Sequence, residues 1–331
     1  MALGAVSLAA PFRRVAAAAA AAEGKTLRGA FMILDTPFTD SGDVDWEDLT
    51  KEALWVDRAG CQGVVWPQGS SGVATLTTKE RMRGMEALAR NLQGKRTALV
   101  LGVQGKDIPE MLGYATRAQE LLPDAVIAMP PTSGTSMDDY RAYFRALASA
   151  VRIPVFLQTS GGAKNLVPST ALIVELAQEF PNFGYVKEES DPLIERMKTE
   201  LQHRPVIKSV FGARLGDGWL YEMRLGLDGV MTGEAMYADL MAQIWDAHEH
   251  GRADEVRDAF SRLLLMRNIE ERLPGTGLYI MKKRGVFKTT VRRTSAPAPG
   301  VPPMLTQFKP SPVEIEEIEY RFAGLKPYLS M

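Results

Sequence analysis

The sequence predicts one α/β fold, a (β/α)8 TIM barrel with extra C-terminal helices. Between residues 28 and 250, eight short apolar runs alternate with amphipathic stretches. The runs are rich in Val, Ile and Ala and mostly apolar on both faces. That composition is typical of parallel strands enclosed by helices on one side and by a packed interior on the other. Eight strand–helix pairs favour a closed barrel over the alternative, an open doubly wound sheet.

The alternation can be followed element by element. Strands are expected at residues 29–34, 63–66, 98–103, 125–129, 154–157, 184–187, 206–211 and 229–232. Helices are expected at residues 46–56, 77–92, 107–122, 136–151, 168–180, 191–201, 218–225 and 239–250. Capping-box spacing precedes three of these helices, in the pairs Thr77 with Glu80, Asp107 with Glu110 and Ser136 with Asp139.

The alternation ends at Gly251. Residues 253–273, 276–285 and 313–325 are expected to be helices, joined through an irregular, proline-rich connection at 294–312. We therefore divide the chain into a leader (1–24), the barrel (25–250) and a C-terminal helical extension packed on the barrel (251–331).

The leader is apolar and alanine-rich, with no acidic residue before Glu23. It resembles the later part of an export signal that lacks its charged beginning. A disordered or helical tail and an organellar transit peptide are the alternatives. The compartment therefore stays open between the periplasm and the cytoplasm.

Composition excludes several classes of partner. The chain has 39 basic and 40 acidic residues, a net charge of −1, and no run of like charges. This balance indicates neither a nucleic acid nor a membrane partner. The three histidines do not have metal-ligand spacing, and the single Cys61 has no disulfide partner and is expected to be a small buried filler.

Two of the predicted strand ends carry residues suited to chemistry. Gly69-Ser70-Ser71-Gly72 follows the second strand, and its hydroxyl and N–H groups can surround a carboxylate or phosphate; a plain turn is the alternative. Lys187 closes the sixth strand. Burial lowers the pKa of an amine, which makes it nucleophilic near neutral pH; a lysine that reaches out to solvent is the alternative.

These motifs, in this order, resemble the dihydrodipicolinate synthase / N-acetylneuraminate lyase family. The resemblance runs from about residue 28 to 293 and rests on Thr36-Pro37-Phe38, Gly69-Ser70-Ser71-Gly72, Val186-Lys187-Glu188, Asp228-Gly229-Val230 and Lys283-Arg284-Gly285. It implies a (β/α)8 barrel with C-terminal helices, assembled as a homo-oligomer (tetramer or dimer), with no metal or organic cofactor. It also implies that Lys187 is the Schiff-base lysine and that Ser70 and Ser71 hold the carboxylate of a 2-oxo acid.

Three positions depart from the family pattern. Gln158 stands where a proton-relaying tyrosine is expected, and Thr132 falls near the position of a second tyrosine, which a neighbouring subunit lends in the synthases. Ala163, next to Lys164, replaces an arginine that binds the aldehyde substrate. An amide cannot give up and recover a proton as a phenol does, so lysine biosynthesis is disfavoured.

Glu189 is our candidate for the missing relay. It lies two residues after Lys187, so the two side chains face the same side of the sheet. The alternative is that Glu189 pairs with a cation at the rim, and Tyr185, two residues before Lys187, is expected to fill the interior.

The sequence therefore predicts a class I lyase, aldolase or hydro-lyase that acts on pyruvate or a sugar-derived 2-oxo acid through Lys187. A homologue that binds a 2-oxo acid without turnover is the alternative. Histidine scarcity disfavours a metal-dependent barrel aldolase. Thr132 and Met231 are the further candidates for substrate contact, and Arg214 and Lys164 suggest an acidic substrate.

Overall fold

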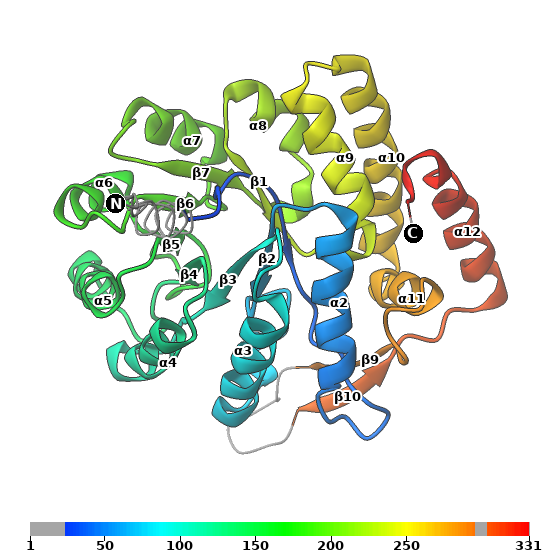
Figure 1. Cartoon of the computed structure of the whole chain (residues 1–331), viewed down its shortest axis with the longest axis horizontal. Coiled ribbons are helices and arrows are strands. Elements are labelled where there is room, and N and C mark those ends of the chain that lie inside the picture. Colours follow the sequence, from blue (N-terminus) through cyan, green and yellow to red (C-terminus); the bar gives the residue numbers. More distant parts are fainter. Residues whose placement is uncertain (1–23, 295–302, 331) are drawn as a thin grey trace, which may run out of the picture.

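The computed structural model describes residues 24–294 and 303–330, and it confirms the predicted fold class. Eight parallel strands form a closed barrel (Figure 1) in the order β1 to β8. Their bounds are Gly29–Ile33, Gly63–Trp66, Ala98–Gly102, Ala125–Ala128, Val155–Gln158, Tyr185–Lys187, Ser209–Gly212 and Gly229–Thr232. Residues 1–23, which hold nearly all of the predicted leader, lie outside the described part.

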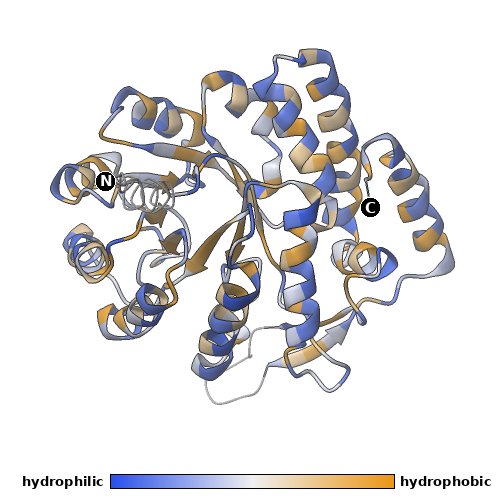
Figure 2. Cartoon of the chain, in the orientation of Figure 1, coloured by the Kyte–Doolittle hydropathy of each residue, from blue (hydrophilic) through white to orange (hydrophobic). Residues whose placement is uncertain are grey.

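Strand β1 closes the barrel by pairing with both β2 and β8, with Phe31 opposite Gly63 on one side and Met231 on the other. Alternate residues point inward and form the interior cluster, which consists of Phe31, Ile33, Val65, Ala98, Val100, Ala125, Ile127, Phe156, Phe211 and Met231. The intervening residues pack against the helices. Figure 2 accordingly shows mainly hydrophobic strands surrounded by helices with both polar and apolar residues.

Eight helices enclose the barrel. They are α2 (Trp46–Ala59), α3 (Thr78–Leu92), α4 (Ile108–Leu121), α5 (Met137–Ala150), α6 (Thr170–Glu179), α7 (Leu193–Gln202), α8 (Trp219–Leu225) and α9 (Ala238–Glu249). Full capping boxes start α3 and α5, as predicted. The box at α4 is only half formed: Asp107 caps the Glu110 amide, but the Glu110 carboxylate accepts from Lys106 instead.

The C-terminal extension contains α10 (Ala253–Arg272), α11 (Thr276–Lys283) and α12 (Pro312–Ala323). Our expectation of irregular chain throughout 294–312 is wrong. β9 (Val291–Thr294) and β10 (Met304–Gln307) form an antiparallel pair. Prolines do not interrupt residues 304–307, so these can pair with β9 despite the proline-rich surroundings.

The β9–β10 pair lies against the rim of the barrel. Val291 packs with Phe38 and Val44 of the loop after β1. Arg293 donates to Glu80 at the start of α3, with Nη2 to Oε1 at 2.8 Å. The pair therefore joins the end of the chain to the loops around the barrel mouth. None of the described helices is both long and apolar enough to cross a bilayer.

Candidate active site

Strand β6 places Lys187 at the carboxyl end of the barrel. Its backbone pairs with Gln158 of β5 and Phe211 of β7. The side chain faces inward because the adjacent Val186 packs with the helices. Lys187 is only 3% exposed, so its amine is largely removed from bulk water.

Two side chains bind the Lys187 amine. Nζ donates to Gln158 Oε1 at 3.1 Å and to Glu189 Oε1 at 2.9 Å. Ser160 completes a ring of contacts, because its hydroxyl accepts from Gln158 Nε2 at 3.0 Å and donates to Glu189 Oε2. The Glu189 carboxylate is thus engaged with Lys187, where the sequence left open a pairing with a rim cation.

The electrostatics of this ring favour a reactive amine. Burial lowers the pKa of Lys187, although the attraction of Glu189 opposes the shift. Burial also acts to raise the pKa of Glu189, but the charge of Lys187 and the hydrogen bond from Ser160 outweigh it, and the net shift is downward. A lowered lysine pKa increases the share of neutral amine, and a carboxylate beside it can accept and return a proton.

Glu188 holds the strand end from the opposite side of the sheet. It is fully buried and accepts from Thr159 Oγ1 at 2.6 Å, from the Ser190 amide at 2.7 Å and from Arg196 Nε at 2.9 Å. Since this carboxylate fixes the backbone on both sides of Glu189, the inward-facing pair has little freedom to move.

The two serines after β2 have different environments. The Ser71 hydroxyl is buried, donates to the Leu34 carbonyl at 2.6 Å and accepts from the Gln68 amide at 3.1 Å. Ser70 is exposed and has no hydrogen-bond partner for its hydroxyl in the described chain. Gly233 leaves room for it, because a Cβ there would lie 3.1 Å from the Ser70 Cβ. Of the two hydroxyls, Ser70 is therefore the one free to meet a ligand.

The remaining predicted contacts lie in two different places. Thr132 is exposed in the loop after β4 and lines a cavity together with Gly69 and Gly72. Met231 is fully buried and packs in the interior cluster with Phe31. Met231 thus fills the barrel interior, as does Tyr185, which packs on the same cluster.

Sequence reasoning missed Ser160, and it did not indicate the partners that Arg214 has within the protein. Ser160 is two residues after Gln158, so strand alternation could have placed both on one side. Arg214 donates to the Glu189 carbonyl at 2.8 Å and pairs with Asp191 at 2.9 Å. Its charge is engaged within the protein, and it anchors the backbone of Glu189 from the β7 side.

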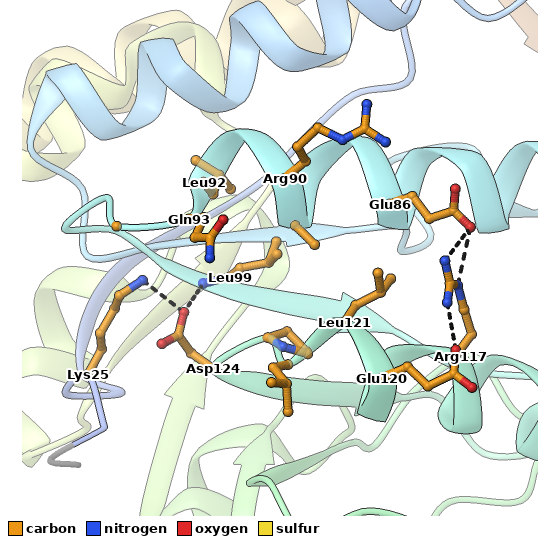
Figure 3. Close-up of a pocket in the computed structure, with 14 residues that line it drawn as sticks. Lys25, Glu86, Arg90, Leu92, Gln93, Leu99, Arg117, Glu120, Leu121 and Asp124 are labelled. Atoms are coloured by element: carbon orange, nitrogen blue, oxygen red, sulfur yellow. Dashed lines mark hydrogen bonds and ion pairs between the residues drawn. The ribbon is translucent and has the colours of Figure 1, made fainter. Parts of the chain in front are cut away.

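A second lysine–carboxylate pair lies at the amino end of the barrel (Figure 3). Lys25 donates to Asp124 at 3.0 Å and to the Thr97 carbonyl at 2.8 Å, just before β4 and β3. In the same pocket, Arg117 pairs with Glu86 and Glu120. Each of these three acids therefore has a cation beside it.

Neither an accessible thiol nor a metal-binding cluster is found in the described residues. Cys61 is buried and donates to the Ala238 carbonyl at 3.1 Å, and burial raises the pKa of its thiol. No group of three or more His, Cys, Asp and Glu side chains in residues 24–294 and 303–330 is arranged to hold a metal ion.

Comparison with known proteins gives a consistent set of relatives. A model of the dihydrodipicolinate synthetase family matches residues 26–299. A 4-hydroxy-tetrahydrodipicolinate synthase of Chlorobium phaeobacteroides is 26% identical, over 82% of this chain and 92% of its own length. An L-2-keto-3-deoxyarabonate dehydratase of Azospirillum brasilense is 23% identical, over 82% of this chain and 89% of its own.

Solved structures share the fold at lower identity. YagE, an Escherichia coli K12 prophage protein solved in complex with pyruvate, superposes with a TM-score of 0.78 at 17% identity, covering 90% of this chain and 98% of its own. CdNal of Clostridium difficile, solved with mannosamine, gives 0.77 at 15% identity, covering 92% of this chain and 100% of its own.

Proposed function

The chain belongs to the dihydrodipicolinate synthetase family, a family of lyases, and on that premise we propose that Lys187 forms an imine with a 2-oxo acid such as pyruvate. The observation that carries the proposal is the position of the Lys187 amine. It is buried at the barrel mouth, its pKa is lowered by burial, and it is aimed at Gln158 and Glu189.

The proposed first step is addition of the neutral amine to the C2 carbonyl carbon. The new C–N bond gives a carbinolamine, and loss of its oxygen as water leaves the imine. The protonated imine then accepts electrons from the adjacent carbons, so that C–C cleavage, C–C condensation or dehydration can follow. The Gly69–Gly72 loop, with the free Ser70 hydroxyl, is suited to hold the C1 carboxylate.

Glu189 is the residue that we propose to move protons in place of the expected tyrosine. Its carboxylate contacts the amine directly and can accept a proton as the carbinolamine forms and return it as water leaves. Gln158 cannot do this, but it accepts a hydrogen bond from Lys187 and donates one to Ser160. Gln158 therefore orients the amine and, through Ser160, the carboxylate.

The natural substrate is proposed to be a sugar-derived 2-oxo acid rather than the substrates of lysine biosynthesis. One relative is named as a dehydratase of such an acid. Thr132 stands near the position of the tyrosine that a neighbouring subunit lends in the synthases, and Ala163 stands where the resemblance implies the arginine that binds the aldehyde substrate. Assembly as a homo-oligomer, tetramer or dimer, is part of the same proposal.

Borohydride reduction in the presence of pyruvate tests the proposal. We expect a stable mass adduct that peptide mapping places on Lys187, and no adduct in Lys187→Ala. Lys25→Ala is the matched control, since it removes a paired lysine at the other end of the barrel. An adduct together with turnover of a sugar-derived 2-oxo acid supports a lyase. An adduct without turnover of any 2-oxo acid assayed would support the homologue that binds a 2-oxo acid without turnover. No adduct with any 2-oxo acid would overturn both.

A further inference from the structure

We propose that a cavity at the barrel rim binds a second carboxylate of the substrate, which makes the natural substrate a dicarboxylic 2-oxo acid. The cavity lies between the loops after β2, β3 and β4 and the C-terminal strand β9, and has a volume of roughly 690 Å³. This is within the usual size range of small-molecule sites. The identity of the substrate as a 2-oxo acid rests on the proposed function; the affinity of the cavity for a carboxylate does not.

The cavity adjoins the proposed imine site. Gly69 and Gly72, the two ends of the loop suited to the C1 carboxylate, form part of its wall. Gly161 forms another part and directly follows Ser160, which binds Glu189. A molecule that extends from the mouth past these residues would therefore enter the cavity with its far end.

A buried arginine lines the cavity without a carboxylate partner. Arg81 is 5% exposed, donates to the Gln104 carbonyl at 2.8 Å and lies over the ring of Tyr114 at 3.5 Å. Its Nε has no hydrogen-bond partner, and it forms no ion pair within the described residues. Burial lowers the pKa of Arg81, and Glu110 across the cavity only partly opposes this shift without forming an ion pair. Because burying a charge without a close counter-charge is costly, an anion bound beside Arg81 would be stabilised.

Two more cations stand at the rim. Lys106 and Arg292 line the cavity, are exposed, and use their charged groups in no ion pair within residues 24–294 and 303–330. The neighbouring Arg293 is different, because Glu80 neutralises it. Glu110 is the acid in the cavity wall. It offsets part of the positive charge, so a singly charged carboxylate fits better than a doubly charged phosphate.

The pocket at the amino end has no such excess of charge, because it is lined by three cations, Lys25, Arg90 and Arg117, and by three acids, Glu86, Glu120 and Asp124. There Lys25 and Arg117 are paired with acids at 3.0 Å or less. In the rim cavity, by contrast, three cations face a single acid. The unbalanced charge is the feature that indicates an anionic ligand.

The test compares acids of equal chain length. The concentration for half-maximal borohydride trapping is measured for 2-oxoglutarate against 2-oxopentanoate and for 2-oxoadipate against 2-oxohexanoate. We expect at least one diacid to be trapped at about five- to tenfold lower concentration than its matched monoacid. In the double variant Lys106→Gln/Arg292→Gln this preference should fall to near one, while trapping of pyruvate is unchanged.

The double variant changes exposed side chains, so it should fold, and Lys25→Gln controls for the loss of a distant positive charge. Equal trapping of diacid and monoacid at both lengths, or an unchanged preference in the double variant, would overturn the inference and leave the Lys187 chemistry standing.

If no acid is trapped at all, the proposed function fails, and the cavity is then tested by itself. Calorimetric titration of the unreduced protein with 2-oxoadipate should still show binding that the double variant weakens about fivefold or more; absence of such binding would overturn the inference as well.

Discussion

The two ends of the barrel each hold a lysine paired with a carboxylate, yet the pairs differ in what they can do. Lys187 and Glu189 at the carboxyl end are 2.9 Å apart, and Lys25 and Asp124 at the amino end are 3.0 Å apart. The Lys187 side chain is 4% exposed and that of Lys25 is 32% exposed. The two N–O distances are nearly equal, so the pairs differ mainly in burial and in the other groups that each lysine and carboxylate contact.

At the amino end, backbone groups take up the remaining bonds. The Thr97 carbonyl accepts from Lys25, and the Leu99 amide donates to Asp124 at 2.8 Å, so this pair ties the chain together. At the carboxyl end, the partners of Lys187 are side chains that can exchange protons or hydrogen bonds. The groups around a lysine–carboxylate pair therefore decide whether the pair holds the chain together or can take part in a reaction.

The largest expected effect is that of Lys187→Ala. It should abolish the borohydride adduct and reduce turnover of the natural 2-oxo acid to background, because no other amine takes part in the ring with Gln158 and Glu189. Mass spectrometry of the reduced protein and a steady-state assay measure the two effects. Turnover at the parent level in Lys187→Ala would show that Lys187 is no more needed for the reaction than Lys25 is.

Glu189→Gln separates the two roles of the carboxylate. Loss of a proton carrier should lower turnover by about 10²–10⁴-fold. Because Glu189 opposes the lowering of the Lys187 pKa, its removal should move the pH midpoint of adduct formation to lower pH. Trapping measured between pH 5 and 10 reports the second effect. Unchanged turnover would show that Glu189 does not carry the proton.

Glu200 of α7, beside Glu188 on the helix-facing side of β6, leads to a prediction about stability. Glu200 of α7 is fully buried, and burial, followed by the charge of Glu188, raises its pKa to about 10. Such a carboxyl is protonated in the folded protein but ionised in the unfolded chain. The folded state therefore loses stability as the pH rises above the pKa of the unfolded chain. Each pH unit between the unfolded and the folded pKa contributes about 1.4 kcal/mol, so we expect the unfolding free energy to fall by several kcal/mol, on the order of 5, between about pH 5 and pH 9.

Glu200→Gln should remove most of that decline, since the amide does not ionise. Denaturant unfolding at pH 6 and pH 9 measures it, with Glu195→Gln on the same helix as the control. An equal decline in the parent and in Glu200→Gln would show that the Glu200 carboxyl ionises without cost in the folded protein.

The smallest expected effect is that of Lys25→Ala. Half-exposed ion pairs contribute about 0–1 kcal/mol, so the loss of unfolding free energy should lie in that range. Trapping with pyruvate should stay at the parent level. A tenfold loss of trapping would show that the amino-end pair matters for the chemistry at the mouth.

Much of the molecule could be predicted from local pattern. The alternation of apolar runs and capped helices predicted the barrel, and a period of two residues placed Lys187 and Glu189 on one side of β6. Other features depended on distant residues. The β9–β10 pair was missed because strand pairing across residues 295–302 leaves little local signal between prolines.

The sequence by itself determined the barrel, the inward-facing lysine and the family, because these follow from periodicity and from motifs of adjacent residues. Only the tertiary structure decided which groups meet the amine, that Ser71 is engaged while Ser70 is free, and that unpaired cations gather in the rim cavity. Those outcomes depend on side chains from different strands and loops. Their contacts and net charge exist only once the barrel has closed.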